Sequence, residues 1–208
     1  MVASWVRREF SGTGVTQYPP GPQLAVIQQQ FGGRALLCID VSGSMSGAPL
    51  QAAIEGGLDF LAEAGQAYYA CGLVLWDTKV VNHVPTTAPA STVQAALRRA
   101  KSGGGTALAP ALRRAIKELG PLKGDRVICV FGDGGIGDPA EAQRLAAEAR
   151  ALGIRFVVRG LGDHASASLT RVLTPEVKGE GQTVHNVEDL RQGIASMAAE
   201  VRMGRGRG

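Results

Sequence analysis

From Arg34 onward, short apolar runs alternate with longer segments rich in Ala, Leu, Arg and Glu, almost to the end of the chain. This alternation is typical of repeated strand-helix-strand units, which place a mostly parallel sheet between two layers of helices. Runs such as ALLCI and VICVF have no polar residue at alternate positions, as expected for strands that helices cover on both faces. The sequence therefore predicts an α/β protein with a single core.

Six segments are predicted to be strands. They are Ala35–Val41, Tyr69–Trp76, Lys79–Val84, Arg126–Phe131, Ile154–Leu161 and a weaker one at Thr183–His185. Only Asp77 and Thr78 separate the second strand from the third, too few residues for a crossover, so this pair should form an antiparallel hairpin at the sheet edge. The expected architecture is a doubly wound, mostly parallel six-stranded sheet with one antiparallel edge strand and helices on both faces.

The intervening segments are predicted to be helices. They are Ala48–Ala64, Thr92–Lys101, Ala107–Leu119, Pro139–Leu152, Ser166–Leu173 and Val187–Met203. Their Ala-rich interiors favour the helical state. Asp138, followed by Pro139, is predicted to cap the N-terminus of the fourth of these helices.

Outside this pattern the chain changes character at both ends. Residues 1–33 contain three prolines and a Gly-Gly break, which predict an N-terminal extension beside a domain that spans residues 34–203. Residues 204–208, with the sequence Gly-Arg-Gly-Arg-Gly, are predicted to be a flexible basic tail. The net charge of +4 is not gathered into one basic surface with interleaved aromatic residues, so no nucleic-acid partner is expected.

The three cysteines, Cys38, Cys71 and Cys129, each lie inside an apolar run, and no C-x-x-C motif is present. An odd number of strand-interior cysteines argues against a disulfide framework and favours a reducing compartment. No apolar stretch approaches the roughly 18 residues of a membrane span, and the first residues lack the apolar core of a signal peptide. We expect a cytoplasmic protein without a membrane span.

Oxygen-bearing side chains follow several of the predicted strands. Asp40, Ser42 and Ser44 stand at alternate positions where the first strand becomes a loop, Thr106 ends a Gly-rich loop, and Asp133 follows the fourth strand. In open α/β sheets, ligands bind at the carboxyl ends of the strands, near the point where the strand order reverses. These five side chains are therefore expected to converge on one ligand.

The chemistry of this set favours a hard cation. It consists of carboxylates and hydroxyls without His or Cys, which suits Mg²⁺, with Mn²⁺ or Ca²⁺ as alternatives, and argues against Zn²⁺. Mg²⁺ usually keeps several waters, so some of the five side chains should act through water. If the hydroxyls bind directly, the charge of the cation stays under-neutralised, and an external carboxylate would complete the site.

The pattern Asp-x-Ser-x-Ser-Met from Asp40, the Gly-Gly-Thr loop ending at Thr106 and the Asp-Gly at Asp133 resemble the metal-ion-dependent adhesion site of von Willebrand factor A domains. The resemblance runs through about residues 33–201. It implies a Rossmann-like fold and no enzymatic activity. It also implies a metal held by Asp40, Ser42, Ser44, Thr106 and Asp133, with both aspartates often acting through water; Asp77 is not a site residue on this account.

The same resemblance implies a function in protein recognition. An acidic side chain of a partner protein typically completes the coordination in this family, and small bacterial-type members point to a MoxR-like AAA+ ATPase or another component of a multi-protein complex. The chain departs from the family at Gly132, where many members have Thr. We expect this departure to have little effect on coordination, although it removes a hydroxyl that could form hydrogen bonds around the metal.

Other interpretations of the same residues remain open. The serines and aspartates could cap backbone donors in an ordinary strand-to-helix turn, and the glycine loop could cradle a phosphate, although it lacks the lysine of a P-loop. A haloacid-dehalogenase-like phosphatase also has an aspartate after its first strand, but Ser42 stands where that family has its second carboxylate. Two rival functions follow: a metal-dependent phosphohydrolase, and a scaffold whose site does not bind metal.

The histidines show no metal-ligand spacing and are expected to be ordinary surface or loop residues. His164 is a partial exception. It follows the fifth strand together with Asp163, so it could lie at the rim of a partner-binding surface at the carboxyl edge of the sheet.

Overall fold

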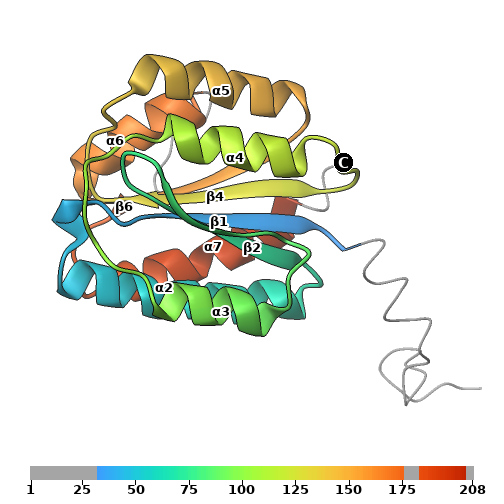
Figure 1. Cartoon of the computed structure of the whole chain (residues 1–208), viewed down its shortest axis with the longest axis horizontal. Coiled ribbons are helices and arrows are strands. Elements are labelled where there is room, and N and C mark those ends of the chain that lie inside the picture. Colours follow the sequence, from blue (N-terminus) through green and yellow to red (C-terminus); the bar gives the residue numbers. More distant parts are fainter. Residues whose placement is uncertain (1–31, 176–182, 205–208) are drawn as a thin grey trace, which may run out of the picture.

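The computed structural model describes residues 32–175 and 183–204 (Figure 1). Apart from two glycines, Gly32 and Gly33, the predicted N-terminal extension lies outside the described residues, as does the predicted tail apart from Gly204. The described elements are β1 (Arg34–Asp40), η1 (Gly43–Met45), α2 (Ala48–Gln66), β2 (Ala70–Trp76), β3 (Val80–Val84), α3 (Ala90–Arg98), α4 (Ala109–Leu119), β4 (Arg126–Gly132), α5 (Pro139–Ala151), β5 (Arg155–Leu161), α6 (Gly162–Leu173), β6 (Thr183–Val184) and α7 (Leu190–Gly204).

The strands form one six-stranded sheet in the order β3-β2-β1-β4-β5-β6. β3 is antiparallel to β2, and all other neighbouring strands are parallel. The predicted sheet, including its antiparallel edge hairpin, is therefore confirmed. Because the chain turns to one side of β1 with β2 and to the other with β4, the strand order reverses between β1 and β4. This is where a doubly wound sheet opens a crevice at its carboxyl edge.

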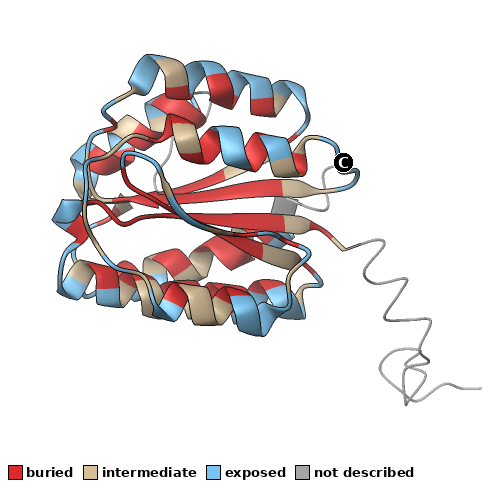
Figure 2. Ribbon diagram, viewed as in Figure 1, coloured by how far each residue is buried: buried red, intermediate tan, exposed pale blue. Residues whose placement is uncertain are grey.

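Helices cover both faces of the sheet, with α4, α5 and α6 on one side and α2, α3 and α7 on the other (Figure 1). β1 shows why its interior, Ala35–Ile39, is apolar at every position. Leu37 and Ile39 pack into the core cluster on the α2 and α7 face, whereas Leu36 and Cys38 pack into the cluster on the α4 and α5 face. In Figure 2 the buried residues accordingly run along the central strands and the inward faces of the helices.

All six predicted helices are present, but four begin at different residues, among them α4, which begins at Ala109 instead of Ala107. α3 begins at Ala90, directly after Pro89, and α7 begins at Leu190. α6 begins at Gly162, a turn earlier than predicted. Gly162 has a φ of 79°, a left-handed conformation that glycine adopts without strain. It allows the helix to start immediately after β5, where a loop was expected.

The three cysteines are free, and Cys38 and Cys129 are buried. Burial raises the pKa of both thiols well above the ordinary range and that of Cys71 to about 12. They therefore behave as small apolar side chains, as predicted. Among the described residues, no helix is long and apolar enough to cross a membrane.

Candidate metal centre

The first part of the centre is the end of β1. Asp40 is the last residue of the strand and is fully buried. Its Oδ1 accepts a hydrogen bond from the backbone N–H of Ser42 at 2.8 Å, which turns the chain into the short helix η1. The aspartate thus holds the start of the loop that carries both predicted serine ligands.

The serines connect this loop to the end of β4. The Oγ atoms of Ser42 and Ser44 lie 3.1 Å apart, and Ser44 Oγ donates a hydrogen bond to Asp133 Oδ1 at 2.9 Å. Ser42 is buried, whereas Ser44 is exposed. Four of the five predicted site residues therefore form one continuous cluster that opens to solvent at Ser44.

The loop that carries Thr106 lies against this cluster. Gly43 donates its N–H to the carbonyl of Gly104 at 3.0 Å, and Gly103 donates to the carbonyl of Val41 at 2.8 Å. Gly104 and Thr106 are two positions apart, so their Cα atoms are separated by at most about 7 Å. Thr106 thus lies in a loop that contacts the serine loop, and the convergence of its hydroxyl with the other four residues on one cation stays a prediction.

On its other side, the same loop is joined to the segment that follows Asp133. The carbonyl of Thr106 accepts a hydrogen bond from Gly137 at 2.7 Å. The three loops that carry the predicted ligands are thus connected to one another through their backbones.

Asp40 is the most strongly perturbed group of the centre. Burial raises its pKa to about 6; the hydrogen bonds from Ser42 oppose this shift, and repulsion from Asp133 adds to it. Its Oδ2 is buried and has no hydrogen-bond partner among the described residues. A buried carboxylate oxygen without a partner is costly. A bound cation, directly or through a water, would remove this cost, so the residues fit a metal.

Gly132 leaves space beside this same oxygen. A Cβ atom at Gly132 would lie 3.4 Å from Asp40 Oδ2. A Thr or Ser at this position would therefore bring a hydroxyl within reach of the unpartnered oxygen. The departure from the family pattern thus has a local structural counterpart, the missing donor to Asp40.

The composition of the cluster restricts how it could bind a cation. Within residues 32–175 and 183–204, no three or more His, Cys, Asp or Glu side chains gather in a metal-binding arrangement. A cation at this edge would rely on the hydroxyls of Ser42, Ser44 and Thr106 as well as on the two carboxylates. Such a set is more weakly charged than one made of carboxylates alone.

Two aspartates near the centre, Asp77 and Asp138, make contacts with backbone groups that the sequence did not predict. Asp77, in the turn after β2, accepts hydrogen bonds from the N–H of Lys79 and, through its carbonyl, from that of Ala107. Its carboxylate lies so close to Gly104 that a Cβ there would be 2.5 Å from Oδ2. Asp77 therefore supports the glycine loop without belonging to the ligand cluster.

Asp138 corrects one prediction. It is the N-cap residue of α5, but its side chain makes no capping bond to that helix. Its oxygens instead accept the N–H groups of Leu108 and Ala109, both at 2.8 Å, at the start of α4. Only the Asp-Pro pair marked this residue in the sequence, and that pair indicates the helix it precedes.

His83 and His164 lie outside the cluster of predicted ligands. His83 pairs with Glu118 at 2.6 Å. His164, in the first turn of α6, is exposed, and its Cε1 would be 3.9 Å from a Cβ at Gly135. His164 therefore lies beside the loop that follows Asp133, and its place at the rim of a partner-binding surface stays a prediction.

The family is decided by comparison with known proteins. Residues 35–136, which include all five predicted ligands, match the family model of the von Willebrand factor type A domain. The chain carries a von Willebrand factor type A domain. No curated protein matches it.

Several solved structures share the fold of this von Willebrand factor A domain. They include a von Willebrand factor type A protein from Catenulispora acidiphila (16% identity, TM-score 0.66, covering 82% of this chain and 43% of that one), the conserved hypothetical protein BatB from Bacteroides thetaiotaomicron (17% identity, TM-score 0.66, covering 83% and 100%), and proximal thread matrix protein 1 from the mussel byssus with a zinc-occupied MIDAS motif (13% identity, TM-score 0.66, covering 84% and 46%). The chain spans less than half the length of the first and third of these. At such identities, the likeness is one of fold.

Proposed function

We propose that the domain is a metal-dependent protein recognition module, in which Mg²⁺ held by Asp40, Ser42, Ser44, Thr106 and Asp133 binds an acidic side chain of a partner protein. The observation that carries this proposal is the cluster of Asp40, Ser42, Ser44 and Asp133, in which the buried Oδ2 of Asp40 has no hydrogen-bond partner among the described residues. The ion supplies an electrophilic site for a carboxylate oxygen when it is bound. Mn²⁺ and Ca²⁺ are the alternatives that the oxygen donors allow.

The charges of the cluster support an external carboxylate. Two aspartates are its only acidic members, and Asp40 is buried beneath the serines whereas Ser44 faces solvent. A cation close to the hydroxyls would therefore have its least neutralised side toward solvent. A negatively charged group from outside would compensate that charge.

The surface around Ser44 supports close approach by a partner. Gly43, Gly104, Gly105 and Gly135 are exposed and carry no side chains that would cover the cluster. A partner loop bearing Asp or Glu could reach the site without rearrangement of the domain. We propose a partner within a multi-protein complex in the cytoplasm, with a MoxR-like AAA+ ATPase as a candidate.

Calorimetric titration of the full chain with Mg²⁺, Mn²⁺, Ca²⁺ and Zn²⁺ tests the metal step. We expect binding of Mg²⁺ or Mn²⁺ by the wild type and its loss in Asp133→Ala. Zinc is included because one structure of similar fold holds zinc in its MIDAS motif. If none of these ions binds the folded wild type even at millimolar concentration, the scaffold interpretation is correct and the proposal fails.

A pull-down with wild type and Asp133→Ala, each with Mg²⁺ or with EDTA, tests the partner step. We expect a partner to be retained only by wild type with Mg²⁺. The isolated partner should then lose binding when its contacting Asp or Glu is changed to Ala. Mg²⁺-dependent turnover of a phosphoester, abolished by Asp40→Ala, would instead establish the phosphohydrolase.

A further inference from the structure

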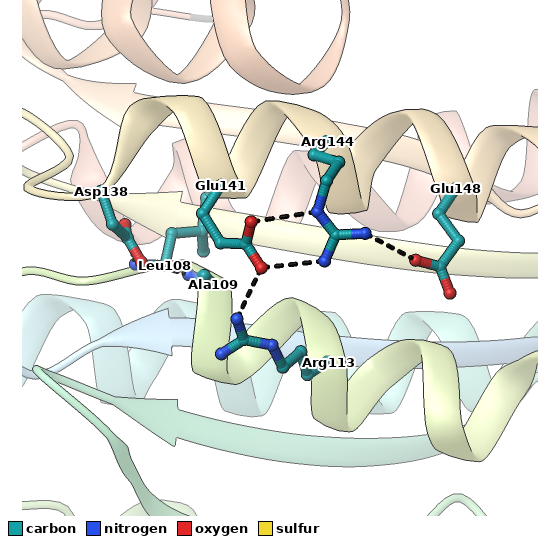
Figure 3. A network of polar contacts seen from close by, with 7 residues as sticks. All are labelled: Leu108, Ala109, Arg113, Asp138, Glu141, Arg144 and Glu148. Carbon is teal, nitrogen blue, oxygen red and sulfur yellow. Dashed lines mark hydrogen bonds and ion pairs between the residues drawn. The ribbon is translucent and has the colours of Figure 1, made fainter.

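The N-terminus of α4 is capped by a residue from another part of the chain. Its own N-cap residue is Leu108, which has no polar side chain, and its first turn contains no acidic residue. The carboxylate of Asp138 accepts the N–H groups of Leu108 and Ala109 instead, each at 2.8 Å (Figure 3). A carboxylate at this position satisfies two free backbone donors and also interacts favourably with the helix dipole.

These bonds extend to the residue that precedes the helix. The carbonyl of Thr106 accepts the N–H of Gly137 at 2.7 Å, and the N–H of Ala107 donates to the carbonyl of Asp77 at 2.8 Å. Each of the four residues from 106 to 109 therefore makes a backbone hydrogen bond to another loop. Three of the four bonds come from the adjacent pair Gly137 and Asp138.

That pair lies in the loop that begins with Asp133. The loop therefore provides one predicted ligand itself and holds the backbone next to another, Thr106. The carboxylate of Asp138 makes no capping bond to its own helix, so its described hydrogen bonds are directed to α4. We infer that Asp138 is a positioning residue of the metal centre, which holds Thr106 in place relative to Asp133 through the first turn of α4.

This inference rests on the proposed metal-binding function, but it concerns a residue outside the ligand set. Groups that orient the ligands of a metal typically contribute about 10- to 100-fold to metal affinity. Removal of the Asp138 carboxylate frees two amides at the base of the Thr106 loop. The cost should therefore appear in metal binding, beyond any change in the stability of the fold.

The neighbouring Glu141 provides a matched control. It also bridges the two helices, because it pairs with Arg113 of α4 at 2.5 Å and with Arg144 of α5 at 2.8 Å (Figure 3). These contacts are made by exposed side chains and do not involve the backbone of the Thr106 loop. Glu141→Gln thus weakens a contact between α4 and α5 while leaving the amides of Leu108 and Ala109 bound.

A second control separates positioning from general destabilisation. Arg126 bonds the carbonyls of Leu119 and Gly120 at the C-terminal end of α4. Arg126→Ala should therefore loosen the same helix at the end far from the site. It should lower the melting temperature and leave metal affinity unchanged.

The experiment is calorimetric titration of the full chain with Mn²⁺ for wild type, Asp138→Ala, Asp138→Asn and the two controls. We expect about tenfold or greater loss of affinity in Asp138→Ala. A smaller loss is expected in Asp138→Asn, whose side chain has a single acceptor oxygen, and no loss in either control. In EDTA, amide hydrogen exchange at Leu108 and Ala109 should be faster in Asp138→Ala than in wild type and unchanged in Glu141→Gln.

The outcomes are distinct. If wild type binds no Mn²⁺, the proposed function fails. If wild type binds Mn²⁺ and both Asp138 variants bind it as tightly as wild type does, the positioning role is overturned. Equal losses of Mn²⁺ affinity in Asp138→Asn and Arg126→Ala would also overturn it. The loss of affinity would then follow from lower stability of the fold and not from the position of Thr106. Asp138→Asn keeps the test decisive if Asp138→Ala does not fold.

Discussion

Ser44 Oγ donates a hydrogen bond to Asp133 Oδ1 at 2.9 Å, which joins side chains that are 89 positions apart in the chain. The two residues follow β1 and β4, the neighbouring strands between which the sheet order reverses. The contact therefore spans the point at which the strand order reverses, where ligands bind in open α/β sheets. It also joins the loop after β1, which carries both predicted serine ligands, to the loop after β4, which carries Asp133.

Ser44→Ala should weaken metal binding with little effect on stability. Ser44 is exposed, so loss of its hydroxyl should change the free energy of unfolding by no more than about 0.5 kcal/mol. Mg²⁺ or Mn²⁺ affinity should fall about tenfold or more, because a ligand and a contact to Asp133 are lost together. Titration calorimetry and urea denaturation measure the two effects.

Ser46→Ala is the matched control for this change. Ser46 is also exposed and lies in the same loop, but it is outside the predicted ligand set. It should bind metal as wild type does. Equal affinity losses in the two variants would show that the loop, and not the Ser44 hydroxyl, determines binding.

The raised pKa of Asp40 predicts a pH effect in the metal-free protein. Burial raises this pKa from an ordinary 3.8 to about 6, so the folded state binds the proton more tightly than the unfolded chain does. Its stabilising contribution is complete below about pH 4 and is lost as the pH rises through about 6. The shift corresponds to at most about 3 kcal/mol.

Asp40→Asn removes this titration and supplies the comparison. In EDTA, the stability advantage of wild type over Asp40→Asn should shrink between pH 4 and pH 7, as measured by urea denaturation. Parallel curves for the two proteins would contradict the prediction. In wild type, Mg²⁺ affinity should increase as the pH rises through about 6, because the ion competes with the proton.

The outline of the fold could be predicted because the apolar runs are unambiguous. The central strand β1 is buried on both faces, so its interior from Ala35 to Ile39 contains no polar residue that would allow another assignment. Helix starts were less predictable. At α6, the glycine that follows β5 has the appearance of a loop residue, and only its left-handed φ shows that the helix begins there.

The grouping of Asp40, Ser42, Ser44 and Asp133 could be predicted because β1 and β4 are neighbouring parallel strands whose ends meet at one edge, whereas Thr106 lies between α3 and α4. The role of Asp138 could not, because its partners are the backbone N–H groups of Leu108 and Ala109. No side-chain pattern identifies backbone donors in a different loop. The supporting position of Asp77 could not be predicted for a related reason, since its carboxylate approaches the backbone of Gly104.

Gly104→Ala should destabilise the domain and impair metal binding. Gly104 has a φ of 75°, and a Cβ there would be 2.5 Å from Asp77 Oδ2. The left-handed conformation alone costs an alanine about 1–2 kcal/mol, and the clash would displace the loop that carries Thr106. Thermal unfolding and calorimetric titration measure both effects.

Gly103→Ala tests whether position within the glycine loop matters. A Cβ at Gly103 meets no atom within 4 Å, so this variant should retain wild-type stability and metal affinity. Similar defects in the two variants would refute the specific role of Gly104.

Arg126→Ala should lower stability without a direct effect on the site. The guanidinium bonds the carbonyl of Gly120 at 3.1 Å and that of Leu152 at 2.6 Å, and so ties the C-terminal ends of α4 and α5 together. Hydrogen bonds to charged groups contribute about 1.5–3 kcal/mol each, so the loss of these two bonds should cost about 3 kcal/mol in urea denaturation. Arg113→Ala, which removes an exposed ion pair to Glu141, should cost less than about 1 kcal/mol.

The pairing of β1 with β2 has an optical consequence. Trp76 is the register partner of Asp40, is fully buried, and has an indole N–H without a hydrogen-bond partner among the described residues. An indole buried in an apolar cluster emits at short wavelength, and the arrival of a positive charge beside Asp40 would alter the electric field across the ring. Trp5 is the only other tryptophan, so Trp5→Phe leaves a single emitter. Ion entry could then be followed by intrinsic fluorescence, without any attached dye.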